Sequence, residues 1–180
     1  SWGKIEIESV SRAGSEVEWS VEGMDDDILV VPLLKEVEPT ERVLLNVDFS
    51  VTIPAVMHRL GWLNDTVNCG NWYPIACVKT QSGFDTSPYY SNGDPFWSDC
   101  SDYKVSITVP SSYLVATPGK SEKRENGVNV RYESVLNNAR DFAFVIGKFN
   151  TLSTKVNGVD VFYYYNKDAD AENTLKTAVD

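Results

Sequence analysis

Histidine is nearly absent from this sequence, which excludes most chemistry that needs an imidazole. The chain of 180 residues contains one histidine, His58. A catalytic zinc takes about three protein ligands, and the His-Glu-x-x-His pattern that supplies two of them from one helix does not occur. No serine lies in a Gly-x-Ser-x-Gly turn. We therefore assign no catalytic residue and no metal ligand to this chain, and we interpret His58 as an ordinary loop or interface residue.

Positive charge is also scarce. Sixteen Lys and Arg residues stand against 26 Asp and Glu residues, which gives a formal net charge of −10. Such a surface repels phosphate backbones and anionic lipid headgroups, so we expect neither nucleic acid nor a membrane surface as a partner. The sequence has no run approaching the roughly 18–20 apolar residues of a membrane span.

Cysteine is limited to Cys69, Cys77 and Cys100. The number is odd, and the spacings fit neither a zinc site nor the dense disulfide framework of a small secreted domain. Two arrangements stay open: a Cys69–Cys77 bridge in an oxidising compartment, or three buried free thiols.

Apolar and aromatic residues, in contrast, are plentiful at 42% and 12%. They alternate with polar residues along most of the chain, which is typical of strands with one buried face. The clearest run is 41–53, where every second residue from Val43 to Ile53 is apolar. Further strands are expected at 4–10, 16–21, 28–34, 103–109, 113–117, 128–135, 142–146, 151–156 and 159–165. The pattern predicts an all-β fold, an antiparallel β-sandwich or saddle.

The C-terminal part adds a hairpin and a helix to this expectation. Asn157-Gly158 suits a type I′ turn, because both residues tolerate positive φ, and predicts a hairpin over 151–165. Acidic residues from Asp168 then precede Ala171, Leu175 and Val179 at helical spacing, which predicts the start of a helix. We expect residues 1–166 to form the β domain. Residues 167–180 would begin a linker helix into a further domain beyond Asp180.

The stretch 54–101 interrupts the alternation and contains at most one expected strand, near 73–78. Loops this long are usually functional or pack against another part of the protein. Its aromatic residues suggest two interpretations: they stack on sugar rings or bury a partner surface, or they form a satellite core under the loop. These residues are Trp62, Trp72, Tyr73, Phe84, Tyr89, Tyr90, Phe96 and Trp97.

Several motifs occur in a fixed order along residues 40–180. They are Asn71-Trp72-Tyr73-Pro74, Gly93-Asp94-Pro95-Phe96, the strand 102–110 ending in Thr108-Val109-Pro110, the strand 113–119, and the segment 139–147. Together they resemble the N-terminal domain of the aminopeptidase N family of zinc metallopeptidases, the gluzincins. The stretch between Pro74 and Asp94 is longer than in typical members, so the chain resembles a divergent bacterial branch.

This resemblance implies a division of labour between two domains. Zinc, held by a His-Glu-x-x-His helix and a distal glutamate, would belong to a downstream catalytic domain, and the present chain would hold no cofactor. The present domain would cap the active-site cleft, exclude water and help position the peptide. Its expected partners are that catalytic domain, which would cover an apolar patch at Trp72-Tyr73-Pro74, and the peptide substrate.

The resemblance also suggests substrate-binding residues. Many members carry a glutamine ahead of the aromatic-Pro motif that helps hold the free amino terminus of the substrate, and this chain has Leu63-Asn64-Asp65 near that place. Asn64, Asn71, Trp72 and Tyr73 are therefore the candidates. Two alternatives remain: a free-standing β-sandwich that binds carbohydrate or protein through the aromatic loop 62–97, and the scaffold domain of a degenerate peptidase.

Overall fold

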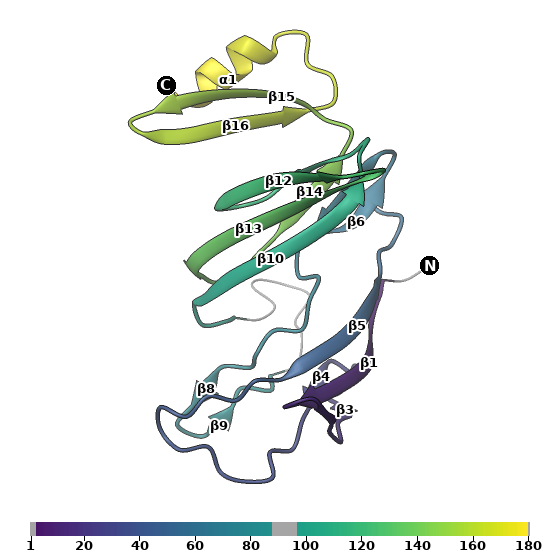
Figure 1. Cartoon of the computed structure of the whole chain (residues 1–180), viewed down its shortest axis with the longest axis vertical. Helices are drawn as coiled ribbons and strands as arrows, with labels where there is room; N and C mark the ends of the chain where they lie inside the picture. The colour runs from purple at the N-terminus through teal and green to yellow at the C-terminus, as the bar shows by residue number, and fades with distance from the viewer. Residues whose placement is uncertain (1–2, 88–96, 180) are drawn as a thin grey trace.

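The computed structural model describes residues 3–87 and 97–179, and these form an elongated, almost entirely β molecule (Figure 1). The strands are β1 (Lys4–Arg12), β2 (Ser15–Glu16), β3 (Ser20–Glu22), β4 (Ile28–Val30), β5 (Asn46–Thr52), β6 (Leu60–Leu63), β7 (Thr66–Cys69), β8 (Lys79–Thr80), β9 (Gly83–Phe84), β10 (Ser101–Pro110), β11 (Leu114–Ala116), β12 (Lys120–Asn126), β13 (Asn129–Ala139), β14 (Phe144–Gly147), β15 (Asn150–Val156) and β16 (Val159–Tyr165). The helix α1 (Ala171–Val179) follows them. The predicted all-β fold with a C-terminal helix is confirmed.

The hydrophobic core lies between two antiparallel sheets, with strand orders β10-β13-β12 and β11-β14-β7-β6. Alternation decides which side chains enter it: in β10, Ile107 and Val109 are buried, whereas Thr108 between them is exposed. Phe142, just before β14, is fully buried at the centre. The buried cluster comprises Cys69, Ile107, Val109, Val115, Val130, Tyr132, Phe142 and Phe144.

The chain crosses from one sheet to the other between β11 and β12. Gly119 has a φ of +71°, and a Cβ atom there would lie 2.3 Å from the carbonyl oxygen of Val135. Beside the crossing, the hydroxyl of the buried Ser134 donates a hydrogen bond to Thr117 Oγ1 at 2.9 Å. Glycine is required at this position, since any side chain would meet backbone that is already paired in β13.

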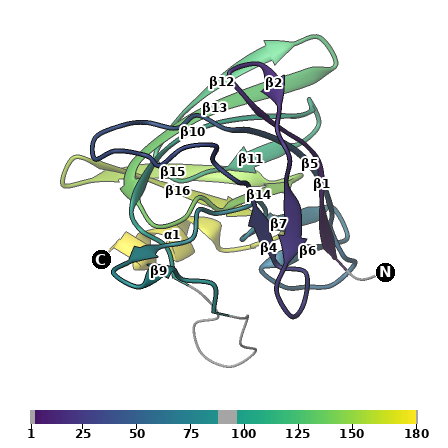
Figure 2. The same cartoon turned by 90° about the horizontal axis from the view of Figure 1, so that it is seen from below.

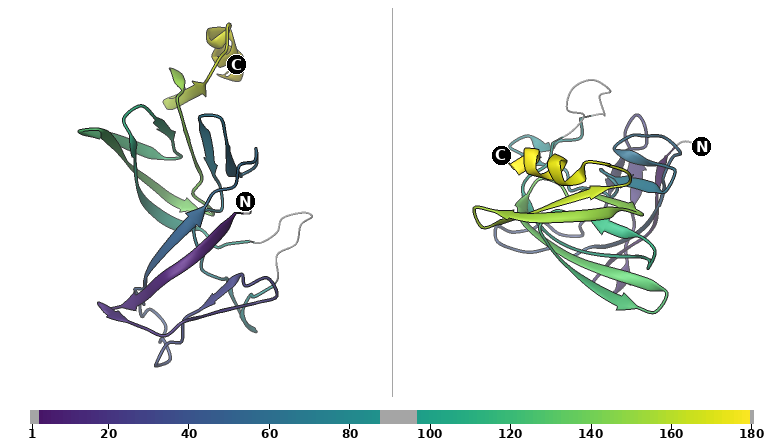
Figure 3. Two further views of the ribbon diagram at one scale, coloured as in Figure 1. Left: turned by 90° about the vertical axis from the view of Figure 1, so that its right-hand side faces the viewer. Right: turned by 90° about the horizontal axis from the view of Figure 1, so that it is seen from above.

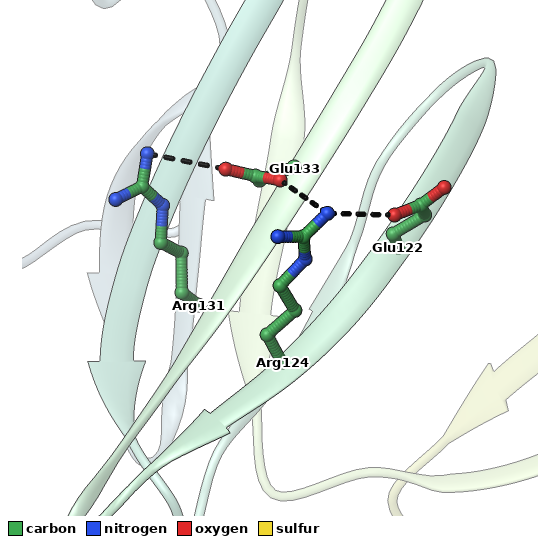
Figure 4. A network of polar contacts seen from close by, with 4 residues as sticks. All are labelled: Glu122, Arg124, Arg131 and Glu133. Atoms are coloured by element: carbon green, nitrogen blue, oxygen red, sulfur yellow. Dashed lines mark hydrogen bonds and ion pairs between the residues drawn. The ribbon is translucent and has the colours of Figure 1, made fainter.

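Strand β12 was not expected, because all seven of its residues are exposed and none is apolar. Its pairing is supplied by β13, and its charges form a ladder on the outer face (Figure 4). Arg124 lies 3.2 Å from Glu122 and 3.3 Å from Glu133, and Arg131 lies 3.2 Å from Glu133. A charged edge strand of this kind discourages pairing with the edge of another molecule.

The N-terminal strands form a separate layer below the sandwich (Figure 1; Figure 2 shows it from below). β5 pairs with β1 in an antiparallel register that shifts between Ile7 and Ser9. Val47, Phe49 and Val51 alternate on one face of β5. The expected strands 28–34 and 41–53 are shorter in the structure, Ile28–Val30 and Asn46–Thr52, because alternation continues beyond the residues that find a pairing partner.

The C-terminal hairpin confirms the turn prediction. β15 and β16 pair from Asn150–Tyr165 to Val156–Val159, and the two turn residues, Asn157 and Gly158, have φ values of 49° and 83°. Helix α1 packs on β15 and buries Ala171 and Leu175. The hairpin and helix lie at the end of the long axis opposite the N-terminal layer (Figure 3).

The expectation for the stretch 54–101 is wrong in detail. It contains four short strands, β6 to β9, and residues 73–78 are not one of them. β6 and β7 form a hairpin, and β7 then pairs with β14, with Cys69 opposite Phe144. Because β14 is distant from β7 in the sequence, no local pattern indicates their pairing, and β7 was therefore not expected.

Candidate functional site

Trp72 connects the N-terminal layer to the sandwich. Its ring packs edge-on against Phe144 with a centroid separation of 5.3 Å, and it contacts Phe49 of β5 at 6.3 Å. The indole Nε1–H donates a hydrogen bond to the carbonyl oxygen of Phe142 at 2.9 Å. Trp72 therefore occupies a structural junction, with its polar group already used by the backbone of the core.

Tyr73 packs edge-on against Trp72 in the same junction, with ring centroids 5.1 Å apart. Its ring lies edge-on to Tyr103 at 6.1 Å, and its hydroxyl donates to Asp141 Oδ1 at 3.2 Å. Burial, then the Tyr103 hydroxyl and the Asp141 carboxylate, raise the pKa of Tyr73. Tyr73 consequently stays a neutral hydrogen-bond donor at physiological pH. Both rings are half-buried, so the expected exposed apolar patch at Trp72-Tyr73-Pro74 is not present.

Asp141 is a residue of this site that the sequence did not single out. The same Oδ1 atom that accepts from Tyr73 also accepts from the amide of Phe142 at 2.6 Å. One carboxylate thus holds the aromatic segment and the entry to β14 together. The sequence distance between Tyr73 and Asp141 hid this pairing.

Asn64 and Asn71 lie at opposite ends of β7. Asn64 belongs to the tight turn between β6 and β7 and has a φ of 53°, and Asn71 follows the strand with the same φ of 53°. Four strand residues separate the two places by about 13 Å at roughly 3.3 Å per residue. The structure therefore does not bring Asn64 together with Asn71–Tyr73. Asparagine tolerates positive φ, which gives both residues a conformational role.

Among the described residues, one ion pair lies at the β6–β7 turn that contains Asn64. Asp65 Oδ1 accepts from Lys148 Nζ at 2.9 Å, and this contact raises the pKa of Lys148. The same ammonium lies 5.3 Å from the centroid of the Tyr113 ring. Asn64 therefore lies next to a solvent-accessible ion pair.

The loop aromatics divide into two groups. Trp72 and Tyr73 are half-buried and pack against the main core cluster and not against a satellite core of their own, whereas Trp62, Phe84 and Trp97 are 44%, 64% and 52% exposed. Tyr89, Tyr90, Phe96 and the motif 93–96 lie outside the described residues.

Phe84 borders an open hollow of about 480 Å³. Asp85 in this hollow accepts from Ser87 and from Trp97 Nε1 at 2.8 Å, and these hydrogen bonds lower its pKa. The side chains around the hollow are Thr80, Ser82, Phe84, Asp85, Thr86 and Ser87. Both carboxylate oxygens of Asp85 already accept hydrogen bonds. The polar groups that the hollow presents to a ligand are therefore mainly hydroxyl groups.

Within residues 3–87 and 97–179, no three His, Cys, Asp or Glu side chains gather as metal ligands do. Over the same residues, no helix has the length and apolar character to cross a membrane. All three cysteines are free thiols, but only Cys69 is buried; Cys77 and Cys100 are exposed, which corrects the expectation of three buried thiols. Burial raises the pKa of the Cys69 thiol to about 11. His58 is exposed, and its carbonyl accepts from Asn68 at 3.0 Å.

Comparison with known proteins gives a likeness to a solved structure. No family model and no curated protein sequence matches the chain. The fold is similar to the crystal structure of the M1 zinc metallopeptidase from Deinococcus radiodurans. The TM-score is 0.59, with 15% identity over 92% of this chain. The chain spans 39% of the length of that structure. At this identity the likeness concerns the fold.

Proposed function

We propose that this chain is the N-terminal, non-catalytic domain of an M1-type zinc metallopeptidase-like protein. It covers the active-site cleft of a downstream catalytic domain, which holds the zinc, and helps to position the peptide substrate. The observation that carries the proposal is the fold likeness, which includes nearly the whole chain and a part of a much longer metallopeptidase. The motif order of residues 40–180 supports it independently.

The distribution of exposed apolar side chains also supports a covering domain. Met24, Leu34 and Leu44 are 87%, 97% and 73% exposed, and all lie in the N-terminal layer. Exposed apolar side chains in this region are available for a contact with another domain. In the proposed protein, residues 1–166 are the β domain, and α1 begins the connection to the catalytic domain.

The proposal gives the candidate residues different roles. Trp72 and Tyr73 are positioning residues, because their polar groups are bonded to Phe142 and Asp141 of the same domain. Asn64 lies exposed at the tip of the β6–β7 hairpin and is the candidate for a hydrogen bond to the amino terminus of the peptide. Asn71 orients the aromatic segment through its positive φ.

The test uses the full-length protein that contains this chain. We expect its coding sequence beyond residue 180 to encode a His-Glu-x-x-His helix, and we expect chelator-sensitive aminopeptidase turnover. Asn64→Ala should raise KM about tenfold, the equivalent of one hydrogen bond to a charged group. The matched control is Asn137→Ala, an exposed asparagine of β13. A continuation without metal ligands, or turnover that a chelator leaves unchanged, would overturn the proposal.

The exposed rings of Trp62, Phe84 and Trp97 favour a second candidate, a β-sandwich module that binds carbohydrate or protein. Such a module should bind a glycan with a change in tryptophan fluorescence that is lost in Trp97→Ala. A glycan array without a hit, together with an unchanged fluorescence titration, would remove carbohydrate as the ligand of this module.

A further inference from the structure

Two segments distant in sequence are fastened to each other at one end by aromatic contact. The rings of Tyr73 and Tyr103 lie edge-on with centroids 6.1 Å apart. Cys77 is four residues after Tyr73, and Cys100 is three residues before Tyr103. Away from this contact, residue numbers increase in the segment that contains Cys77 and decrease in the segment that contains Cys100. Each cysteine is therefore a similar number of residues from the contact.

At their other end, both segments are hydrogen-bonded to Asp85, which lies between them in the sequence. The amide of Asp85 donates to the carbonyl oxygen of Val78 at 2.8 Å, and the Asp85 carboxylate accepts from Trp97 Nε1 at 2.8 Å. Cys77 immediately precedes Val78, and Cys100 follows Trp97 by three residues. Each cysteine thus lies between the two fastenings, and the segments 73–78 and 97–103 run in opposite directions.

The segment that carries Cys100 is also held on the core. Ser98 Oγ donates to the carbonyl oxygen of Arg140 at 2.6 Å, and Arg140 Nη1 donates to the carbonyl oxygen of Ser98 at 2.7 Å. At about 3.3 Å per extended residue, Cys77 lies at most about 13 Å along the chain from the Tyr73–Tyr103 contact, and Cys100 at most about 10 Å. The two cysteines therefore lie within a short chain length of one common contact.

We propose that Cys77 and Cys100 form an oxidisable thiol pair that closes into a disulfide. Both thiols are exposed, whereas Cys69 lies in the core. Disulfides span Cα atoms about 4.4–6.8 Å apart, so closure of the bridge brings the two segments to that separation at Cys77 and Cys100. The pairing differs from the Cys69–Cys77 bridge that sequence spacing alone allows, and it does not depend on the peptidase proposal.

The oxidant class is a small-molecule disulfide such as oxidised glutathione. The Cys77 thiolate attacks one glutathione sulfur, forming a mixed disulfide and releasing one reduced glutathione. The Cys100 thiolate then attacks the Cys77 sulfur and releases the second. The two protein thiols are oxidised by two electrons, one glutathione disulfide is reduced, and the two thiol protons leave with the two glutathione molecules.

The experiment incubates the purified chain with oxidised glutathione and counts free thiols. We expect a fall from three thiols to one and a linked peptide pair containing Cys77 and Cys100. Chymotrypsin is the protease of choice, because cleavage after Trp72 separates Cys69 from Cys77. The bridge should raise the melting temperature by about 6–12 °C, the gain expected from closing a loop of this size.

Two matched variants, Cys77→Ser and Cys100→Ser, keep the test decisive, since both positions are exposed and tolerate the change. In either variant the remaining exposed cysteine should stop at the mixed disulfide with glutathione, and the melting temperature should not rise. A link between Cys69 and Cys77 would overturn the proposal. Separate glutathione adducts on Cys77 and Cys100 of the unsubstituted chain, without a linked peptide, would overturn it as well.

Discussion

The sandwich and the N-terminal layer are built from the same alternating pattern but differ in how that pattern is used. The sandwich encloses a cluster of eight buried residues, all between Cys69 and Phe144. Among the described residues up to Thr52, only Val10 is a buried apolar residue, although β5 alternates as regularly as β10. Alternation therefore determines which face of a strand is apolar. A second sheet or another domain is needed to cover that face.

The largest expected effect comes from a substitution in the core of the sandwich, the better covered of the two regions. Phe142→Ala removes a ring with no exposed surface and leaves a cavity at the centre of the sandwich. We expect a loss of about 3–5 kcal/mol in the free energy of unfolding. Urea denaturation followed by tryptophan fluorescence measures it. The control is Phe162→Ala, where the side chain is 59% exposed and the loss should stay within about 0.5 kcal/mol.

Trp72→Phe tests the junction between the two regions. The substitution keeps an aromatic ring but removes the donor to the Phe142 carbonyl, which should cost about 1–2 kcal/mol. The N-terminal layer should then become separable from the sandwich. Limited proteolysis should cut more rapidly within residues 13–45 while fragments of the sandwich persist. Equal acceleration of cutting in both regions would show that they unfold together and that Trp72 is not their connection.

A third test concerns the opposite end of the molecule, where Asp168 caps helix α1. The carboxylate accepts from the Asp170 amide at 2.9 Å, from the Thr174 hydroxyl at 2.8 Å and from the Tyr163 hydroxyl at 2.9 Å, and these bonds lower its pKa from 3.8. A carboxyl group whose pKa is lower in the folded than in the unfolded state stabilises the fold at pH values above its ordinary pKa. This contribution is lost as the pH falls through the pKa of the folded state. The hydrogen-exchange protection factors of α1, which are corrected for the intrinsic pH dependence of exchange, should therefore fall below about pH 4. Asp168→Asn should remove most of this pH dependence.

The smallest effect is expected at the charged ladder of β12. Arg124→Gln removes the cation between Glu122 and Glu133, two carboxylates that face each other across the strand pair. All these groups are accessible to solvent, so the loss should be about 0.2–1 kcal/mol and should shrink at high salt. Thermal unfolding at low and at high ionic strength measures it. A loss that is independent of salt would indicate packing of the arginine stem as the cause.

The sequence alone was sufficient to predict the elements that have a local sequence signal. The hairpin 150–165 follows from Asn157-Gly158, and α1 follows from its acidic start and the spacing of Ala171 and Leu175. β12 and β7 could not be recognised, because the first has no apolar face and the second depends on a partner far along the chain.

The candidate site shows the same limit. The motif Asn71-Trp72-Tyr73-Pro74 is a feature of the sequence, but its contacts with Phe142 and Asp141 come from folding. Asn64 lies at the far end of β7 for the same reason. Adjacency in a motif thus identified the segment, and only the strand pairing determined which of its groups remain accessible.

The pairing of β7 with β14 has a consequence for synthesis of the chain on the ribosome. When β7 emerges, residues 144–147 have not yet been made, and at about 5–20 residues per second they follow only after several seconds. During that interval β7 can pair with β6 but not with β14. The nascent sandwich is therefore a natural client for chaperones, and synonymous codons between β7 and β14 would influence yield without changing a single residue.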